Sequence, residues 1–158
     1  MILYHGGALE ISTPEIRISK YTKDFGSGFY CTDIKTQAQR WSLKFDTPTV
    51  NFYEYTMCAD TKILKFETMT EEWLDFIVSC RNGSAHDYDI VEGPMADDQV
   101  YSYIADYLSG TISREAFWVL AKFKYPTHQI AFCTPLALSC LKFAGSERVS
   151  EIARNKRS

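Results

Sequence analysis

The chain has 158 residues, of which 46% are hydrophobic, 23% charged and 15% aromatic. This length is typical of one domain that can bury a core without a disulfide or a metal, so we expect a single domain over residues 1–158. The net charge of −3 excludes the strongly basic surface with which proteins bind nucleic acid or anionic membranes nonspecifically.

The cysteines and the amino terminus carry the only signals about cellular compartment. Five cysteines lie far apart within apolar runs, at Cys31, Cys58, Cys80, Cys133 and Cys140. We expect them to be reduced core thiols, as in a cytoplasmic protein. The first residues, MILYHGGALEIS, lack a basic region and a long apolar core, and no stretch reaches the roughly 18 apolar residues of a membrane helix. The sequence therefore predicts a cytoplasmic protein without a membrane segment.

The amino-terminal third contains two predicted strands and one predicted helix. Residues 1–5 (MILYH) form a short apolar strand that stops at a pair of glycines. Residues 8–27 show no clean period and predict a loop with at most one helical turn. The segment GFYCT, residues 28–32, predicts a second strand. A helix over residues 34–45 follows, with Asp33 as its expected cap.

The middle of the chain alternates strands with one helix. Apolar and β-branched residues predict strands over residues 49–57 and 61–66. Thr68 and Glu71 have the spacing of a capping box ahead of WLDFIVSC, a helix that ends at Asn82-Gly83. The segment YDIVEGPM predicts another strand that ends in a turn.

The last third contains two helices, a strand and a basic tail. Asp97 or Asp98 caps a helix that ends before Gly110, and Ser113 starts another through Phe123. The segment HQIAFCT predicts a strand, and Thr134-Pro135 begins a short helix. The sequence does not assign LKF at residues 141–143, and we expect residues 146–158 to be a partly ordered basic tail. Strands interleaved with helices predict a mixed α+β domain.

Few residues in this chain could carry chemistry, and each has a structural alternative. His5 precedes two glycines, so a ligand could approach the backbone beside its imidazole, although a histidine packed under a turn is the commoner arrangement. Gly26-Ser27-Gly28 also allows close backbone approach but matches no phosphate loop. Tyr30 and Trp41 could line two sides of one slot, or both could be core aromatics.

Two other kinds of site have weaker support. His86, Asp87 and Asp89 match no calcium-loop spacing, so we predict no metal site. The sequence has no G-x-S-x-G elbow, so a hydrolase triad has no local signature here.

Two segments together resemble a known enzyme superfamily. YHG at residues 4–6 and FGSGFYCTD at residues 25–33, followed by a helix with an aromatic residue at Trp41, are similar to the H-Y-E branch of ADP-ribosyltransferases. The second segment resembles FGKGIYFAD of poly(ADP-ribose) polymerases. Over most of the chain, YHGG, DFGSGFYCT and YDIVEGPMADD also resemble a bacterial domain family of unknown function that is often encoded beside small partner genes. The resemblance implies a split β-sheet core with surrounding helices.

The resemblance also implies roles for individual residues. His5 would hydrogen-bond a ribose hydroxyl of NAD, and the Gly6 backbone would hold the nicotinamide carboxamide. Tyr30 and Trp41 would stack on the two faces of the nicotinamide ring. We include Gly28 among the NAD-binding residues because its backbone can be approached closely. A family serine that also holds the carboxamide is replaced here by Ala38.

The third family residue is a glutamate at the start of a strand, and its best match is Gln129. Cleavage of NAD passes through a ribose cation, for which a carboxylate is the expected stabiliser. A neutral amide keeps the hydrogen bond and loses the charge, so Asp97 or Asp98 is an alternative source of the acid.

The resemblance therefore implies an NAD-dependent mono-ADP-ribosyltransferase, a toxin-like bacterial enzyme that needs no metal. Its acceptor would be a protein or nucleic acid, and a small antitoxin-like protein would neutralise it. Two alternatives stay open, namely an inactive module that binds NAD or ADP-ribose and an NAD glycohydrolase.

Overall fold

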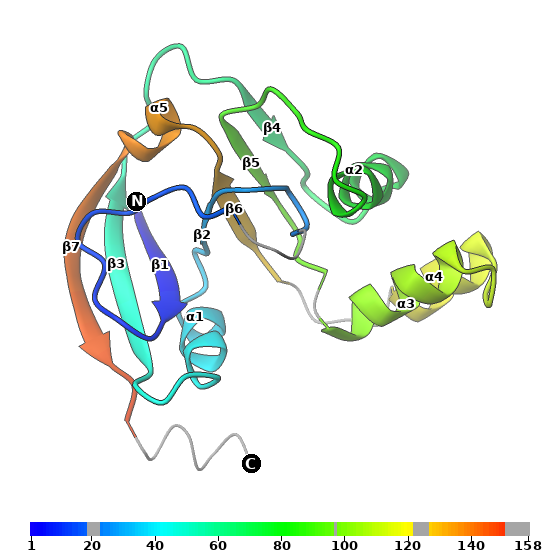
Figure 1. Ribbon diagram of the computed structural model, residues 1–158, viewed down its shortest axis with the longest axis horizontal. Helices are drawn as coiled ribbons and strands as arrows, with labels where there is room; N and C mark the ends of the chain where they lie inside the picture. Colours follow the sequence, from blue (N-terminus) through cyan, green and yellow to red (C-terminus); the bar gives the residue numbers. More distant parts are fainter. Residues whose placement is uncertain (19–22, 97, 122–126, 151–158) are drawn as a thin grey trace.

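The computed structural model describes residues 1–18, 23–96, 98–121 and 127–150. These residues form two β-sheets and five helices, as expected for an α+β domain. The three-stranded sheet has the order β1-β3-β7 and the four-stranded sheet the order β2-β6-β5-β4 (Figure 1). The strands are β1 (Ile2–Gly7), β2 (Phe29–Cys31), β3 (Thr49–Tyr55), β4 (Ile63–Lys65), β5 (Ile90–Gly93), β6 (Gln129–Phe132) and β7 (Leu141–Arg148).

The helices surround the sheets and do not separate them. They are α1 (Lys35–Ser42), α2 (Glu71–Arg81), α3 (Asp98–Leu108), α4 (Arg114–Ala121) and α5 (Pro135–Leu138). Helices α3 and α4 lie side by side at one end of the molecule (Figure 1). Within the described ranges, no helix is long and apolar enough to cross a membrane.

A backbone bridge joins the two sheets at Tyr4 of β1 and Thr32, the residue that follows β2. The Tyr4 N–H donates to the Thr32 carbonyl at 2.8 Å, and the Thr32 N–H donates to the Tyr4 carbonyl at 2.9 Å. This pair is an isolated antiparallel bridge, with no ladder recorded on either side of it among the described residues. The sheets are therefore joined at Tyr4 and diverge toward the carboxyl end of β1.

Three apolar clusters hold these layers together. One cluster is contributed by both sheets and contains Leu3, Tyr53, Phe29 and Phe132. A second covers the other face of the four-stranded sheet with side chains of α2, α3 and α4, including Trp73, Ile104 and Phe117. In the smallest cluster, Ala38 of α1 packs on the outer face of the three-stranded sheet. The helices thus bury apolar side chains in clusters that also include sheet residues.

Two predicted helix caps are confirmed and two are wrong. Thr134 caps α5, accepting from the Ala137 N–H, and the Ser113 hydroxyl accepts from the Ala116 N–H before α4. Thr70, and not Thr68, caps α2 by accepting from the Trp73 N–H at 3.2 Å. Asp33 does not cap α1, because the helix begins one residue later than expected: its N-cap position is Ile34, which has no side-chain cap hydrogen bond. The Asp33 carboxylate instead lies 3.1 Å from Nδ1 of His128.

The structure contains a carboxyl-terminal strand that the sequence did not assign. LKF begins β7, which pairs with β3 along its length and continues to Arg148 opposite Thr49. Residues 146–148 therefore belong to the sheet and not to a tail. Residues 151–158 of the predicted tail lie outside the described residues, as does Asp97.

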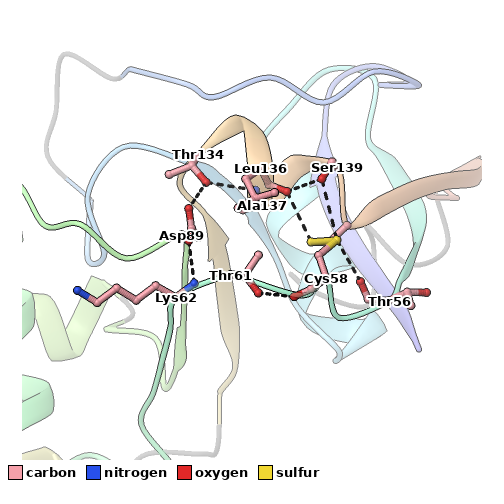
Figure 2. The surroundings of a disulfide bond; sticks show 10 residues. Thr56, Cys58, Thr61, Lys62, Asp89, Thr134, Leu136, Ala137 and Ser139 are labelled. Carbon is pink, nitrogen blue, oxygen red and sulfur yellow. Dashed lines mark hydrogen bonds between the residues drawn. A yellow bond between two sulfur atoms is a disulfide. The ribbon is translucent and has the colours of Figure 1, made fainter.

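The expectation of five reduced cysteines is wrong for two of them. Cys58 and Cys140 form a disulfide with a Cα–Cα distance of 5.6 Å, whereas Cys31, Cys80 and Cys133 are free. Figure 2 shows the disulfide between the loop that follows β3 and the end of α5. Sequence spacing did not reveal the pair because the two cysteines are 82 residues apart and meet only through sheet pairing.

The same region is fixed by hydrogen bonds around Asp89, which Figure 2 also shows. The Thr134 hydroxyl donates to Oδ1 of Asp89 at 2.6 Å, and the Lys62 N–H donates to Oδ2 at 2.7 Å. These bonds hold the pKa of the Asp89 carboxyl below its ordinary value. Asp89 therefore ties the start of β4 to the start of α5.

Loss of the disulfide should destabilise the fold. A cross-link that closes a loop of 82 residues is expected to contribute about 2–4 kcal/mol, mainly by restricting the unfolded chain. We expect Cys58→Ser to lower the free energy of unfolding by that amount in urea titrations. Cys133→Ser should change it by less than about 1 kcal/mol. Thiol titration of the denatured wild type without reductant should find three reactive cysteines, and five would contradict the pairing.

Candidate functional site

The backbone of Gly6 faces the split between β1 and β2. Alternate residues of an antiparallel strand direct their N–H and C=O groups to opposite sides. Because Tyr4 bonds to Thr32 of the other sheet, Gly6, two residues later, points its own groups the same way. Continuing that register places Tyr30 opposite Gly6, yet within the described part of the chain no backbone bond joins them. The register therefore directs the Gly6 N–H and C=O toward β2, where the described residues provide no backbone partner for them.

Gly6 also has a packing role, which involves α1. A Cβ at this position would lie 2.2 Å from the Ala38 carbonyl oxygen and 3.2 Å from the Ser42 nitrogen. Only glycine allows the helix to approach β1 so closely. The Ala38 backbone therefore lies directly against Gly6.

His5 links β1 to β2 through its side chain. Its Nδ1 lies 2.6 Å from the Tyr30 carbonyl oxygen, and its ring stacks on Phe29 with centroids 4.3 Å apart. Because a carbonyl only accepts, Nδ1 carries the proton and Nε2 of the neutral ring is an acceptor. Burial lowers the pKa of His5 from 6.5 to about 4, so the ring is neutral at pH 7.

This histidine should make the fold sensitive to acid. The unfolded chain binds the proton more tightly than the folded chain, so stability is full above pH 6.5 and falls as the pH drops toward about 4. We expect the His5 contribution to fall by about 1.4 kcal/mol per pH unit in this window. Urea unfolding at several pH values should show a flatter profile for His5→Gln. Parallel profiles for the two proteins would contradict a buried neutral imidazole.

Tyr30 fixes the loop that precedes β2. Its hydroxyl donates to the Gly26 carbonyl at 2.6 Å and accepts from the Phe25 N–H at 3.0 Å. Gly26 has φ of 83°, a conformation that favours glycine. Burial raises the pKa of Tyr30, which keeps the hydroxyl protonated. The phenol hydroxyl is thus a structural anchor, and the ring packs against the apolar cluster beneath α2.

A cation already lies near the Tyr30 ring. Nζ of Lys23 is 5.1 Å from the ring centroid, which is within the range of a cation–π contact. Burial is the main reason that the pKa of Lys23 is lowered. The ring face therefore suits a cation that has lost part of its hydration.

Gln129 contacts a buried carboxylate that the sequence did not single out. Its Nε2 donates to Oδ2 of Asp24 at 2.9 Å, and both side chains are buried, with relative exposures of 7% and 4%. The Ala96 N–H donates to the same oxygen at 2.8 Å, while Nε of Arg81 donates to Oδ1 at 2.9 Å. Asp24 had no local signal beyond the turn letters DFGSG, because its partners Arg81 and Gln129 are 57 and 105 residues away.

The structure brings three of the sequence-predicted residues close together. His5 bonds to Tyr30, and Tyr30 pairs with Ala131, two residues from Gln129 on the same face of β6. Tyr30 and Gln129 both contact the loop over residues 24–26, one through its hydroxyl and the other through its amide. The segment DFGSGFY therefore contains a loop that is held in place by hydrogen bonds to Tyr30 and Gln129.

Two further NAD-binding candidates occupy different environments. Trp41 is 42% exposed on α1, and Nζ of Lys44 lies 3.4 Å from the centroid of its ring. Trp41 is therefore not a core aromatic, and its ring forms a cation–π contact with Lys44. Gly28 packs so closely on β6 that a Cβ there would lie 2.9 Å from the Phe132 carbonyl oxygen.

A second polar cluster lies beside the start of β6. Nε2 of His128 is 2.7 Å from Glu92, and its Nδ1 is 3.0 Å from the Asp33 backbone nitrogen. The hydrogen bond from His128 lowers the pKa of Glu92. Both side chains line a cavity of about 210 Å³ with Lys65 and Glu67. A larger cavity of about 370 Å³ lies beside Lys23 and Ser27. Neither cavity is lined by His5, Tyr30 or Gln129.

The residues considered for a metal site have other partners. Asp87 pairs with Nζ of Lys62 at 2.6 Å, and Nε2 of His86 lies 2.8 Å from the Phe25 carbonyl oxygen. Across the described segments, no three His, Cys, Asp or Glu side chains form a group that could hold a metal ion. Asp98 is the first residue of α3.

Comparison with known proteins places the chain in one family. A family model described as protein of unknown function (DUF3990) matches residues 1–143. Searches of curated proteins and of solved structures found no match. The match covers both sheets, apart from the last residues of β7, and all the candidate residues described above. The chain therefore belongs to the DUF3990 family of proteins of unknown function.

Proposed function

We propose that this protein is an NAD-dependent mono-ADP-ribosyltransferase whose active site is the split between β1 and β2. The observation that carries the proposal is the Gly6 backbone, which points an N–H and a C=O into the split opposite Tyr30. A primary carboxamide has the complementary acceptor and donor on one planar group. Nicotinamide is such a carboxamide on an aromatic cation, which also suits a tyrosine ring.

The surrounding residues have chemistry that fits the rest of the nucleotide. The neutral His5 ring directs Nδ1 to Tyr30 and leaves Nε2 to accept a hydrogen bond from a ribose hydroxyl. Lys23 now lies over the face of the Tyr30 ring. On NAD binding, the nicotinamide ring would take the place of the Lys23 ammonium group on that face. Trp41, exposed on α1 one helical turn from Ala38, would close over the opposite face of the nicotinamide.

The proposed reaction breaks the bond between nicotinamide and C1′ of the ribose. The electron pair of that bond leaves with nicotinamide, which becomes neutral, while C1′ takes on positive charge. The acceptor then donates an electron pair to C1′ and loses its proton. The protein would contribute mainly by holding the ring and the ribose in fixed orientations, with Gln129 directed toward the ribose.

We propose a protein or nucleic acid as the acceptor, and toxin-like activity that a small partner protein restrains. The net charge of −3 favours a protein or a short nucleic acid over a long duplex. Expression in a bacterial host would test the toxin part, since growth should slow with the wild type and not with His5→Ala.

The direct test is nicotinamide release from NAD by the purified protein, with intact-mass measurement of the protein and of proteins and nucleic acids from an added cell lysate. We expect release together with a mass gain of one ADP-ribose on a macromolecule. His5→Ala should reduce release about tenfold to a hundredfold, because it removes a positioning hydrogen bond. Release without any mass gain would identify an NAD glycohydrolase instead.

A second candidate function is an NAD-binding module without catalysis. The observation that favours it is the amide at Gln129, which is buried and bonded to Asp24 and carries no charge of its own. Calorimetric binding of NAD without nicotinamide release would support this alternative. No binding and no release would contradict both functions.

A further inference from the structure

We propose that Asp24 and Gln129 together replace the single glutamate expected at the third position of the site. In this pair Gln129 supplies the acceptor oxygen that contacts the ribose, and Asp24 is a positioning residue that orients the amide and supplies the negative charge behind it. The inference rests on the proposed transferase function and explains how a chain with glutamine at this position could still be active.

The hydrogen bond from Gln129 to Asp24 fixes which end of the amide faces the substrate. In the structure the Asp24 carboxylate accepts hydrogen bonds from Arg81 and from the Ala96 N–H, and it forms an ion pair with Arg81. The NH₂ group of Gln129 must therefore face Asp24, which lies 2.9 Å away. Oε1 is then directed away from Asp24. Without this partner, the amide could rotate and present a donor where the ribose needs an acceptor.

The Asp24 carboxylate is held in place from three directions. Arg81 donates to Oδ1, while the Ala96 N–H and the Gln129 amide donate to Oδ2. Arg81 offsets the cost of burying the charge, and the remaining lone pairs are satisfied. A glutamine that merely packed in the core would not need a buried ion pair behind its amide.

The charge of Asp24 can act through the amide at low energetic cost. An N–H bonded to a carboxylate is polarised, which increases the negative partial charge on the carbonyl oxygen of the same amide. In a buried site this effect is screened less than in water. The pair would thus present to a ribose cation an oxygen that is more negative than that of an isolated amide.

The loop geometry keeps the pair aligned with the ring that holds nicotinamide. Asp24 is followed directly by Phe25 and Gly26, whose backbone groups bond to the Tyr30 hydroxyl. Tyr30 and Gln129 therefore hold consecutive residues of one loop. A shift of the ring would move the carboxylate, so the stacking group and the charged group are mechanically coupled.

The test is a charge-exchange cycle with four proteins: wild type, Gln129→Glu, Asp24→Asn and the double variant. We measure kcat and KM for nicotinamide release, with thermal unfolding to verify folding. Gln129→Glu should lower kcat about tenfold or more, because two carboxylates would then face each other. Asp24→Asn should lower kcat by a similar factor. The double variant, with the charge moved to position 129, should recover to within about threefold of wild type, with KM little changed throughout.

Each outcome decides the matter. If Gln129→Glu is more active than wild type, or if the double variant shows no recovery, the pair does not act as proposed. If Asp24→Asn fails to fold, the kcat of Gln129→Glu still tests the inference. If Gln129 were only a weakened replacement for a catalytic glutamate, Gln129→Glu would raise kcat, whereas the proposed pair requires that it lower kcat. If the wild type releases no nicotinamide, the proposed function itself fails. If the wild type is active but the effects of the two substitutions on kcat simply add in the double variant, only the inference about Asp24 and Gln129 fails.

Discussion

Replacing Tyr30 by alanine should lower the rate of nicotinamide release by about tenfold to a hundredfold. The substitution removes the ring that would stack on nicotinamide, a contact worth about 0.5–1.5 kcal/mol beyond its buried area. It also removes the hydroxyl that holds Phe25 and Gly26, so the loop that carries Asp24 loses an anchor. The measurement is steady-state release from NAD at fixed protein concentration.

Two controls separate stacking from loop anchoring. Tyr30→Phe retains the ring and loses both hydrogen bonds, so its activity should lie between those of wild type and Tyr30→Ala. Tyr53→Phe removes a similar buried bond, from the Tyr53 hydroxyl to the Ile11 carbonyl at 2.6 Å, at a position outside the split. It should lower stability by about 1 kcal/mol and leave release per folded molecule unchanged. Equal release by wild type and Tyr30→Ala would rule out a role for the ring.

Gly6→Ala should damage both the fold and the site. The new Cβ would collide with the Ala38 carbonyl at 2.2 Å, so α1 must move away from β1. Overpacking of this kind costs about 1–3 kcal/mol of unfolding free energy. The shift would also displace Trp41, which is on the same helix. We therefore expect weaker NAD binding in titration calorimetry together with a lower unfolding midpoint in urea.

The neighbouring glycine provides a matched control. A Cβ at Gly7 would meet only the His5 ring, at 3.5 Å from Nε2, which is an ordinary contact distance. Gly7→Ala should therefore change the free energy of unfolding by less than about 1 kcal/mol. If both variants unfold at the same urea concentration, the close packing of α1 on Gly6 is not important for stability.

Local patterns predicted most elements because their signals lie within a few residues of each other. The capping of α5 by Thr134 and the end of α2 at Asn82-Gly83 were predicted from adjacent letters, and both are confirmed. Strand β7 was not predicted, since local patterns do not assign LKF and residues 146–148 were expected to belong to a tail. Its side chains are exposed or half-buried, and a bulge between Phe143 and Gly145 of β7, opposite Tyr53 and Phe52, interrupts its alternation. An edge strand with little buried surface has a weak sequence signal.

The candidate site also has one part that could be predicted from the sequence and another that could not. His5, Gly6, Tyr30 and Gln129 could be proposed from motif letters, and the structure brings His5, Gly6 and Tyr30 to one split between the sheets. The roles that packing gives them could not be read from the letters. The Tyr30 hydroxyl anchors a loop, and Gln129 bonds to Asp24.

The sequence by itself determined the α+β class and most strand and helix positions, and it suggested the glycine and aromatic residues of the candidate site, because turn chemistry and periodicity act over short stretches of chain. Only the tertiary structure decided that Cys58 meets Cys140 and that Asp24 meets Arg81 and Gln129. These contacts join residues 57–105 positions apart. Their geometry follows from how the sheets pair and pack, which no local stretch of sequence specifies.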